Sequence, residues 1–201
     1  MRRTNIIILA LTLVIAAAEF AVAQTTHPLS KSDQGDWALY SVTVENSTTP
    51  LLSVKDQQRW RAVTMVQETG VRIDNFTLMG GRKAGLGPSM IDFDRPFEPV
   101  FEISHGAKIE VVSSVPENLA VKGKTYACTK IVRKVSRPLN PDAMQTDWNG
   151  TSTVWTCPDV PLGGIVKIEN QYESQFTADS KPDKIKETWT LADFGLKNWQ
   201  E

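Results

Sequence analysis

This chain contains few histidines and cysteines and has almost no net charge. Each of these features excludes a class of function. The 201 residues include two histidines and two cysteines, and the formal net charge at pH 7 is −1. Nucleic-acid binding depends on a basic surface that displaces counterions, which a nearly neutral chain does not favour. A zinc site needs three or four clustered ligands, and no such spacing occurs. We therefore expect no nucleic-acid partner, no metal and no cofactor.

A helical period is also missing over any long window. β-branched and aromatic residues instead alternate with polar ones, as in Ala38, Tyr40 and Val42, which is typical of strands. Gly70 can take the positive φ of a hairpin turn between two such runs. The expected strands are 36–44, 60–67, 71–79, 108–113, 124–135, 151–157, 164–176 and 184–191. This spacing predicts a mainly β fold with little helix, in which a single curved antiparallel sheet forms a half-barrel or a barrel.

Three segments are expected to lie between strands or outside the sheet. Residues 80–88 hold four glycines and are predicted as a surface loop; they lack the Gly-Lys-Ser/Thr ending of a phosphate-binding loop. Residues 93–101 alternate phenylalanine with proline, which cannot donate to a sheet ladder, so they belong at an edge or outside the sheet. Residues 116–118 (Pro-Glu-Asn) are predicted as a turn.

The one long apolar run stands at the start of the chain. Arg2 and Arg3 precede an apolar stretch from Ile6 to Ala18, and Ala21 and Ala23 provide the small residues of a signal-peptidase site. We expect an exported protein, periplasmic or extracellular, with no membrane span after cleavage, since no second run approaches the length of a span. The expected parts are a signal peptide over 1–23, a flexible lead over 24–35 and a single antiparallel β domain over 36–201.

The two cysteines give the most specific structural prediction. Cys128 and Cys157 lie in two predicted strands joined by a polar connection. If these strands pair antiparallel about the middle of that connection, the two cysteines face each other. In an oxidising compartment this predicts a disulfide. The alternative is two separate thiols, one of them catalytic, although no histidine stands near either in the sequence.

Other catalytic patterns are weak. His105 is the histidine that a Ser-His-Asp or Cys-His arrangement would have to use, and the adjoining Gly106 favours a turn. Asp92 and Asp94 could form an acid/base pair or a calcium site, but their alternation with Phe93 favours a strand with one wet face. We predict no catalytic residue and no enzyme activity.

The tryptophans fit two interpretations. They can fill the core, which is the usual place for aromatic residues on strands, or they can line a concave apolar cavity that holds a lipid. The six are Trp37, Trp60, Trp148, Trp155, Trp189 and Trp199.

Roughly the last 80 residues resemble exported, uncharacterised bacterial β proteins. Residues 154–167 carry the pattern Trp-x-x-x-x-Val-Pro-x-Gly-Gly-x-Val-Lys, preceded by Gly-Lys-Thr-Tyr-Ala-Cys at 123–128 and followed by a Leu-x-x-Phe-Gly tail at 191–195. The pattern is also similar to the curved sheets of the periplasmic lipoprotein-carrier superfamily. The resemblance implies this fold and no activity. We expect a non-enzymatic cell-envelope protein that binds a lipid or other apolar ligand on a curved sheet. The alternative is a structural or protein-interaction module with a filled core and another envelope protein as its partner.

Overall fold

One antiparallel sheet accounts for nearly all of the described chain. The computed structural model describes residues 27–79, 82–95, 97, 107–138, 147–175 and 181–197. The strands are β1 (Trp37–Asn46), β2 (Val54–Gln67), β3 (Gly70–Met79), β4 (Arg82–Asp92), β5 (Lys108–Val121), β6 (Lys124–Arg137), β7 (Asp147–Thr156), β8 (Ile165–Gln175) and β9 (Asp183–Gly195). Two short 3-10 helices, η1 (Pro28–Lys31) and η2 (Pro50–Leu52), complete the described elements. The predicted mainly β class with little helix is confirmed.

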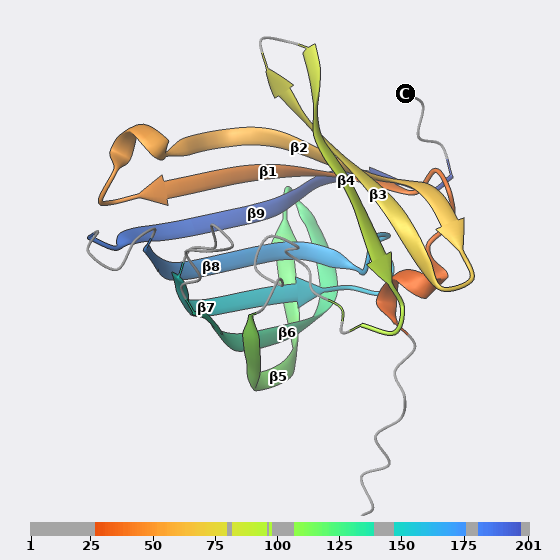
Figure 1. Cartoon of the computed structure of the whole chain (residues 1–201). Coiled ribbons are helices and arrows are strands. Elements are labelled where there is room, and N and C mark those ends of the chain that lie inside the picture. The colour runs from red at the N-terminus through yellow and green to blue at the C-terminus, as the bar shows by residue number, and fades with distance from the viewer. Residues whose placement is uncertain are drawn as a thin grey trace, which may run out of the picture.

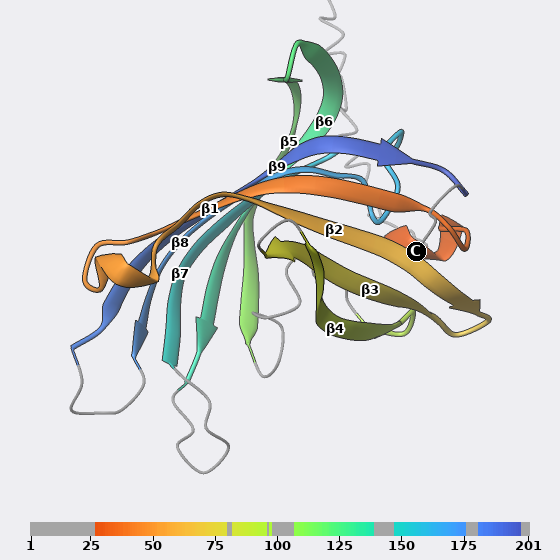
Figure 2. The ribbon, with the colours of Figure 1, turned by 90° about the horizontal axis from the view of Figure 1, so that it is seen from above.

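The nine strands form one open sheet in the order β4-β3-β2-β1-β9-β8-β7-β6-β5. Edges therefore remain at β4 and β5, so of the two predicted forms the sheet is the curved, unclosed one rather than a barrel. Figure 1 shows β1, β9, β8 and β7 side by side, and Figure 2 shows the sheet curving strongly, with one end of the β5–β6 hairpin rising above the rest.

The core follows the period-2 alternation that the sequence predicted. We call the face of the sheet that carries Tyr40 the inner face. Tyr40 pairs with Leu191 of β9, and the next inner row runs from Val42 through Trp189 and Ile168. Cross-strand partners share a face, so the apolar residues of these neighbouring strands all lie on the inner face. Tyr40, Val42, Ile168 and Leu191 are all exposed by 2% or less, which places the core on this face.

Two segments predicted as loop or turn are strand. Residues 82–88 belong to β4 and 116–118 to β5; both predictions were wrong, while 80–81 lie outside the described residues. The reason is that β4 and β5 are edge strands with one partner each. An edge strand tolerates proline, whose missing N–H can face away from the ladder, and tolerates glycine at a bulge. Gly87, with φ +93, stands next to such a bulge between β3 and β4.

The start of the described chain packs against the sheet. The flexible lead predicted over 24–35 is wrong from residue 27 onward, because η1 places Leu29 in the core with no exposed surface. His27 is 8% exposed, and its Nδ1 accepts a hydrogen bond from the Leu29 N–H. Its ring lies 5.3 Å from Phe93 and 5.7 Å from Phe97, which are outside the strands as predicted. The proposed signal peptide, residues 24–26 and the remainder of 93–101 lie outside the described residues.

A close approach of β7 and β8 requires glycine at position 150. A Cβ on Gly150 would stand 2.1 Å from the Gln171 carbonyl oxygen and 2.7 Å from the Tyr172 Cβ. Tyr172 is the cross-strand partner of Gly150, and its ring stacks on Trp148 with centroids 4.2 Å apart. The bare glycine therefore lets an aromatic pair close over the strand.

The Gly150→Ala variant should lose about 1–3 kcal/mol of unfolding free energy, since the new methyl group meets backbone that cannot rotate away. Urea denaturation measures this. Gly85→Ala is the matched control, because a Cβ there meets nothing within 4 Å, and it should change stability by less than about 0.5 kcal/mol. Equal effects of the two substitutions would contradict the close approach.

The pH dependence of stability should report the packing of His27. Burial lowers the pKa of His27 below its ordinary value of 6.5, so the unfolded chain binds the proton before the folded chain does. Stability should therefore fall as the pH drops through 6.5, where protonation also removes the acceptor that holds the Leu29 N–H. Denaturation between about pH 7.5 and 5.5 tests this, and His27→Asn, which keeps an acceptor without titrating, should flatten the dependence. An unchanged slope in that variant would show that His27 is not the group responsible.

Candidate functional site

Four polar side chains lie next to one another on the inner face. The register pairs Arg133 of β6 with Ser152 of β7, Ser152 with Asn170 of β8, and Asn170 with Glu187 of β9. Ser152 and Asn170 have no exposed surface, and Glu187 and Arg133 are 6% and 7% exposed. We call these four residues the polar row. Burial of this kind costs free energy unless hydrogen bonds replace those to water.

Apolar rows flank the polar row on both sides. Trp189, Ile168 and Val154 are paired across β9, β8 and β7 one step towards η1. Ile185, Tyr172 and Gly150 are paired one step towards the opposite end of these strands. The polar row is thus a polar strip inside an apolar face.

Two hydrogen bonds join neighbours within the polar row. Arg133 Nη2 donates to Ser152 Oγ at 2.9 Å, and Asn170 Nδ2 donates to Glu187 Oε2 at 3.0 Å. The second bond fixes the orientation of the Asn170 amide, because a carboxylate can only accept. Asn170 Oδ1 is buried and has no hydrogen-bond partner among the described residues. A buried acceptor without a donor is rare in native proteins.

A second set of polar groups on the inner face is satisfied within the core. The Tyr40 hydroxyl donates to the Ile165 carbonyl at 3.3 Å, and burial raises the pKa of Tyr40 to about 12 against the opposing effect of Arg61. Arg61 donates to Asn75 Oδ1, and the Arg59 guanidinium lies 5.0 Å from the Trp189 ring. These contacts hold the β1–β3 half of the core together.

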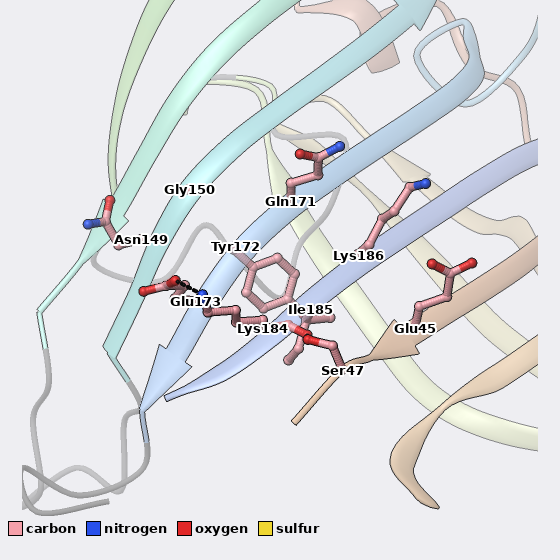
Figure 3. A pocket seen from close by; sticks show the side chains of 10 residues that line it. All are labelled: Glu45, Ser47, Asn149, Gly150, Gln171, Tyr172, Glu173, Lys184, Ile185 and Lys186. Carbon is pink, nitrogen blue, oxygen red and sulfur yellow. Dashed lines mark hydrogen bonds and ion pairs between the residues drawn. The ribbon is translucent and has the colours of Figure 1, made fainter. Parts of the chain in front are cut away.

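An open pocket crosses one end of the sheet, shown in Figure 3. Its volume is ≈ 520 Å³. Gln171 pairs with Lys186 and Lys186 with Glu45, on the face opposite the polar row, and Lys184 forms an ion pair with Glu173 at 3.5 Å. The lining residues come from β1 and the residue directly after it, and from β7, β8 and β9: Glu45, Ser47, Asn149, Gly150, Gln171, Tyr172, Glu173, Lys184, Ile185 and Lys186.

The predicted neighbouring positions of the cysteines agree with the register. Thr129 pairs with Thr156, which places Cys128 and Cys157 next in line on β6 and just past β7. The structure gives both as free, buried thiols, so the disulfide is not formed in it and stays a prediction. Burial, with Cys157 and Glu117 nearby, raises the pKa of Cys128 to about 11. A thiol held protonated is a poor nucleophile, which weighs against the catalytic alternative for Cys128.

An aromatic-cation cluster that no sequence pattern predicted lies beside the cysteines. Trp155 Nε1 donates to Glu117 Oε1 at 2.8 Å, and this bond is the main reason why the pKa of Glu117 lies below its usual value. The ammonium groups of Lys130 and Lys167 lie 5.3 and 5.2 Å from the Trp155 ring, and Lys130 also pairs with Glu117 at 3.1 Å. The cluster ties β5, β6, β7 and β8 together, so Trp155 packs in the protein rather than lining a pocket.

The other sequence candidates do not come together as a site. Asp92 ends β4 and forms an ion pair with Arg95 at 3.4 Å, whereas Asp94 is exposed in the turn that follows. His105 lies outside the described residues.

Protein from an oxidising medium should contain the Cys128–Cys157 disulfide, because neighbouring antiparallel positions bring the Cα atoms within bonding range. Unreduced, unfolded protein should then show no reactive thiol on maleimide labelling, and reduction should expose both. The oxidised form should exceed the reduced form by roughly 3–4 kcal/mol in unfolding free energy. Cys128→Ser/Cys157→Ser should match the reduced wild type. Two reactive thiols before reduction would contradict the pairing.

In the described part of the chain no group of three or more His, Cys, Asp or Glu residues is arranged to hold a metal ion. The same residues include no helix with the length and apolar character needed to span a membrane. Comparison with protein-family models and with curated proteins finds no match to this chain.

Proposed function

We propose that this protein is an exported, non-enzymatic binding protein of the cell envelope that holds an apolar or amphiphilic ligand, such as a lipid, on its curved sheet. The open pocket carries the proposal. Its ≈ 520 Å³ falls in the range of small-molecule sites, which are about 300–1,000 Å³.

The lining of the open pocket suits an uncharged or zwitterionic amphiphile. Tyr172 and Ile185 are among its lining residues with their side chains on the inner face, and the polar side chains on the pocket's own face carry both signs. Lys184 is paired with Glu173, and Lys186 stands beside Glu45 in the register. With the positive charges balanced in this way, the pocket has no excess charge that would select a strongly anionic or cationic ligand.

Export is supported by the sequence alone. The basic start, the apolar run and the Ala-x-Ala ending of residues 1–23 have the order of a signal peptide. An envelope location would bring the protein into contact with lipids.

One observation favours the alternative, a structural or protein-interaction module. The inner face is filled where Tyr40, Ile168 and Leu191 lie, since all are exposed by 2% or less. The edge strand β5 also exposes Val111, Val112 and Val115 by 60%, 53% and 46%. An apolar edge strand is a template for pairing with another chain.

The Gln171→Trp variant, which places a large ring in the open pocket, should weaken binding of the fluorescent apolar probe N-phenyl-1-naphthylamine by about tenfold or more. Fluorescence titration measures the dissociation constant. Thr188→Trp is the matched control, because Thr188 faces the same side of the sheet on β9 but does not line the pocket.

Equal binding by wild type and Gln171→Trp, or an equal loss in Thr188→Trp, would contradict the pocket as the ligand site. Native mass spectrometry of protein from its own envelope separates the two functions. A co-purifying lipid supports the proposal, whereas a protein partner or a dimer without a small ligand supports the alternative.

A further inference from the structure

Two neighbouring leucines form an exposed apolar tip at one end of the sheet. Leu51 and Leu52 lie in η2 (Pro50–Leu52), and their exposed fractions are 96% and 60%. η2 joins β1 to β2, and Figure 2 shows it as the short orange coil between these strands. Holding two leucine side chains in water is unfavourable, and a partner that covers them would recover this free energy. We call Leu51 and Leu52 the leucine tip.

Hydrogen bonds hold the turn around the leucine tip in one conformation. Asn46 Oδ1 accepts from the N–H groups of Thr48 and Thr49 at 3.0 and 2.7 Å. Ser53 Oγ accepts from the Asn46 N–H at 2.9 Å. Thr49 Oγ1 donates to Asp183 Oδ1 of β9 at 2.9 Å. The leucines are therefore presented by a braced turn, so little conformational entropy is lost when they contact a partner.

The backbone of this turn suits an environment without water. The Leu52 N–H donates to the Thr49 carbonyl at 2.9 Å, and the Ser53 N–H donates to the Pro50 carbonyl at 3.0 Å. Pro50 has no N–H of its own. A backbone N–H without a partner is strongly unfavourable in hydrocarbon, so these bonds and the proline lower the cost of entering an apolar layer.

The size and the charge of this surface indicate what covers it. A stable dimer buries roughly 800 Å² per partner, which two leucines cannot supply, whereas a bilayer takes up single apolar side chains. Lys55 follows the turn in β2 and Lys184 lies beside it; both are exposed, so their ammonium groups can reach lipid phosphates. Asp183 and Glu173 at the same end balance these charges. Charges of both signs suit zwitterionic headgroups better than a strongly anionic surface.

We propose that the leucine tip inserts into the surface of a lipid bilayer with zwitterionic headgroups and docks this end of the sheet there. Ser47, which lines the open pocket, stands just before the turn, and its N–H donates to the Lys184 carbonyl at 3.0 Å. Docking therefore places the open pocket close to the headgroup layer. The inference rests on the proposed envelope location, which provides the bilayer, but it does not depend on ligand binding in the pocket.

The test uses protein collected after export and vesicles of phosphatidylcholine. The wild type should float with the vesicles in a density gradient, and titration with vesicles gives the partition constant. Leu51→Ser/Leu52→Ser should weaken binding by about a hundredfold, because moving each leucine side chain out of water contributes about tenfold. Leu51→Phe/Leu52→Phe keeps the tip apolar and should bind at least as tightly as the wild type.

Val111→Thr/Val112→Thr is the matched control, since these valines form another adjacent exposed pair, on β5, with exposed fractions of 60% and 53%. It should bind vesicles as the wild type does. Every variant carries the same N-terminus, so the apolar run near the start of the chain cannot produce a difference between them. A wild type that does not float, or equal binding by the wild type and Leu51→Ser/Leu52→Ser, would overturn the inference. An equal loss in the valine control, or a wild-type dimer in sedimentation velocity that Leu51→Ser/Leu52→Ser converts to a monomer, would overturn it as well.

Naphthylamine binding, measured without vesicles, separates this inference from the proposed function. Leu51→Ser/Leu52→Ser should bind N-phenyl-1-naphthylamine as the wild type does, which also shows that the variant is folded. Gln171→Trp should still float with the vesicles. Wild-type protein that binds vesicles but not the naphthylamine rejects the pocket alone, whereas protein that binds the naphthylamine but not vesicles rejects the leucine tip alone.

Discussion

The pairing of β1 with β9 is the contact on which the rest of the sheet depends. Every other ladder in the described sheet joins strands that are neighbours in the sequence. β1 and β9 instead bring Trp37 opposite Gly195 and Asn46 opposite Ile185, from opposite ends of the described chain. Two meanders, β1–β4 and β5–β9, thereby become one sheet. Loop-closure entropy makes such a pairing slow to form, so the local hairpins can form before it.

The open pocket and the polar row both inherit their geometry from this ladder. The open pocket takes Glu45 from β1, Ser47 from directly after β1, and Lys184 and Lys186 from β9, so it exists only when the two strands are paired. Ser47 also donates its N–H to the Lys184 carbonyl at 3.0 Å, which fixes this end of the ladder. On the other face, Val44 pairs with Glu187 and closes the polar row at its acidic end. A single long-range pairing thus organises both the pocket and the polar row.

The sequence predicted the parts of the fold that depend on alternation and failed where edge position mattered. Period 2 identified the strands, and the symmetry of Cys128 and Cys157 about their connection gave the β6–β7 register. Pro116 and the glycines of β4 carry turn signals, and no local pattern tells an edge strand from a turn. Leu29 was missed because a single apolar residue in a polar segment has no period.

The polar row left a faint sequence signal. Asn170 stands in the apolar phase of β8, between Ile168 and Tyr172, where alternation predicts a buried apolar side chain. Ser152 is likewise a polar residue on β7, two positions before Val154, where alternation predicts a buried apolar side chain. What the sequence could not supply is the register that sets these breaks side by side, because each strand alone fits several pairings.

The polar row also restricts which register the sheet can adopt. A slip of two residues between β8 and β9 would keep every side chain on its own face, so the apolar pattern alone opposes it only weakly. It would, however, move Asn170 from Glu187 to Ile185 or Trp189 and bury a carboxylate without its amide donor. Breaking a buried polar pair costs more than forming it contributes, so such a row selects one register even when it adds little net stability. Register selection accounts for the Asn170–Glu187 and Arg133–Ser152 bonds. Asn170 Oδ1 is the buried oxygen of the amide that donates to Glu187, so it carries part of the free-energy cost at which the row selects one register.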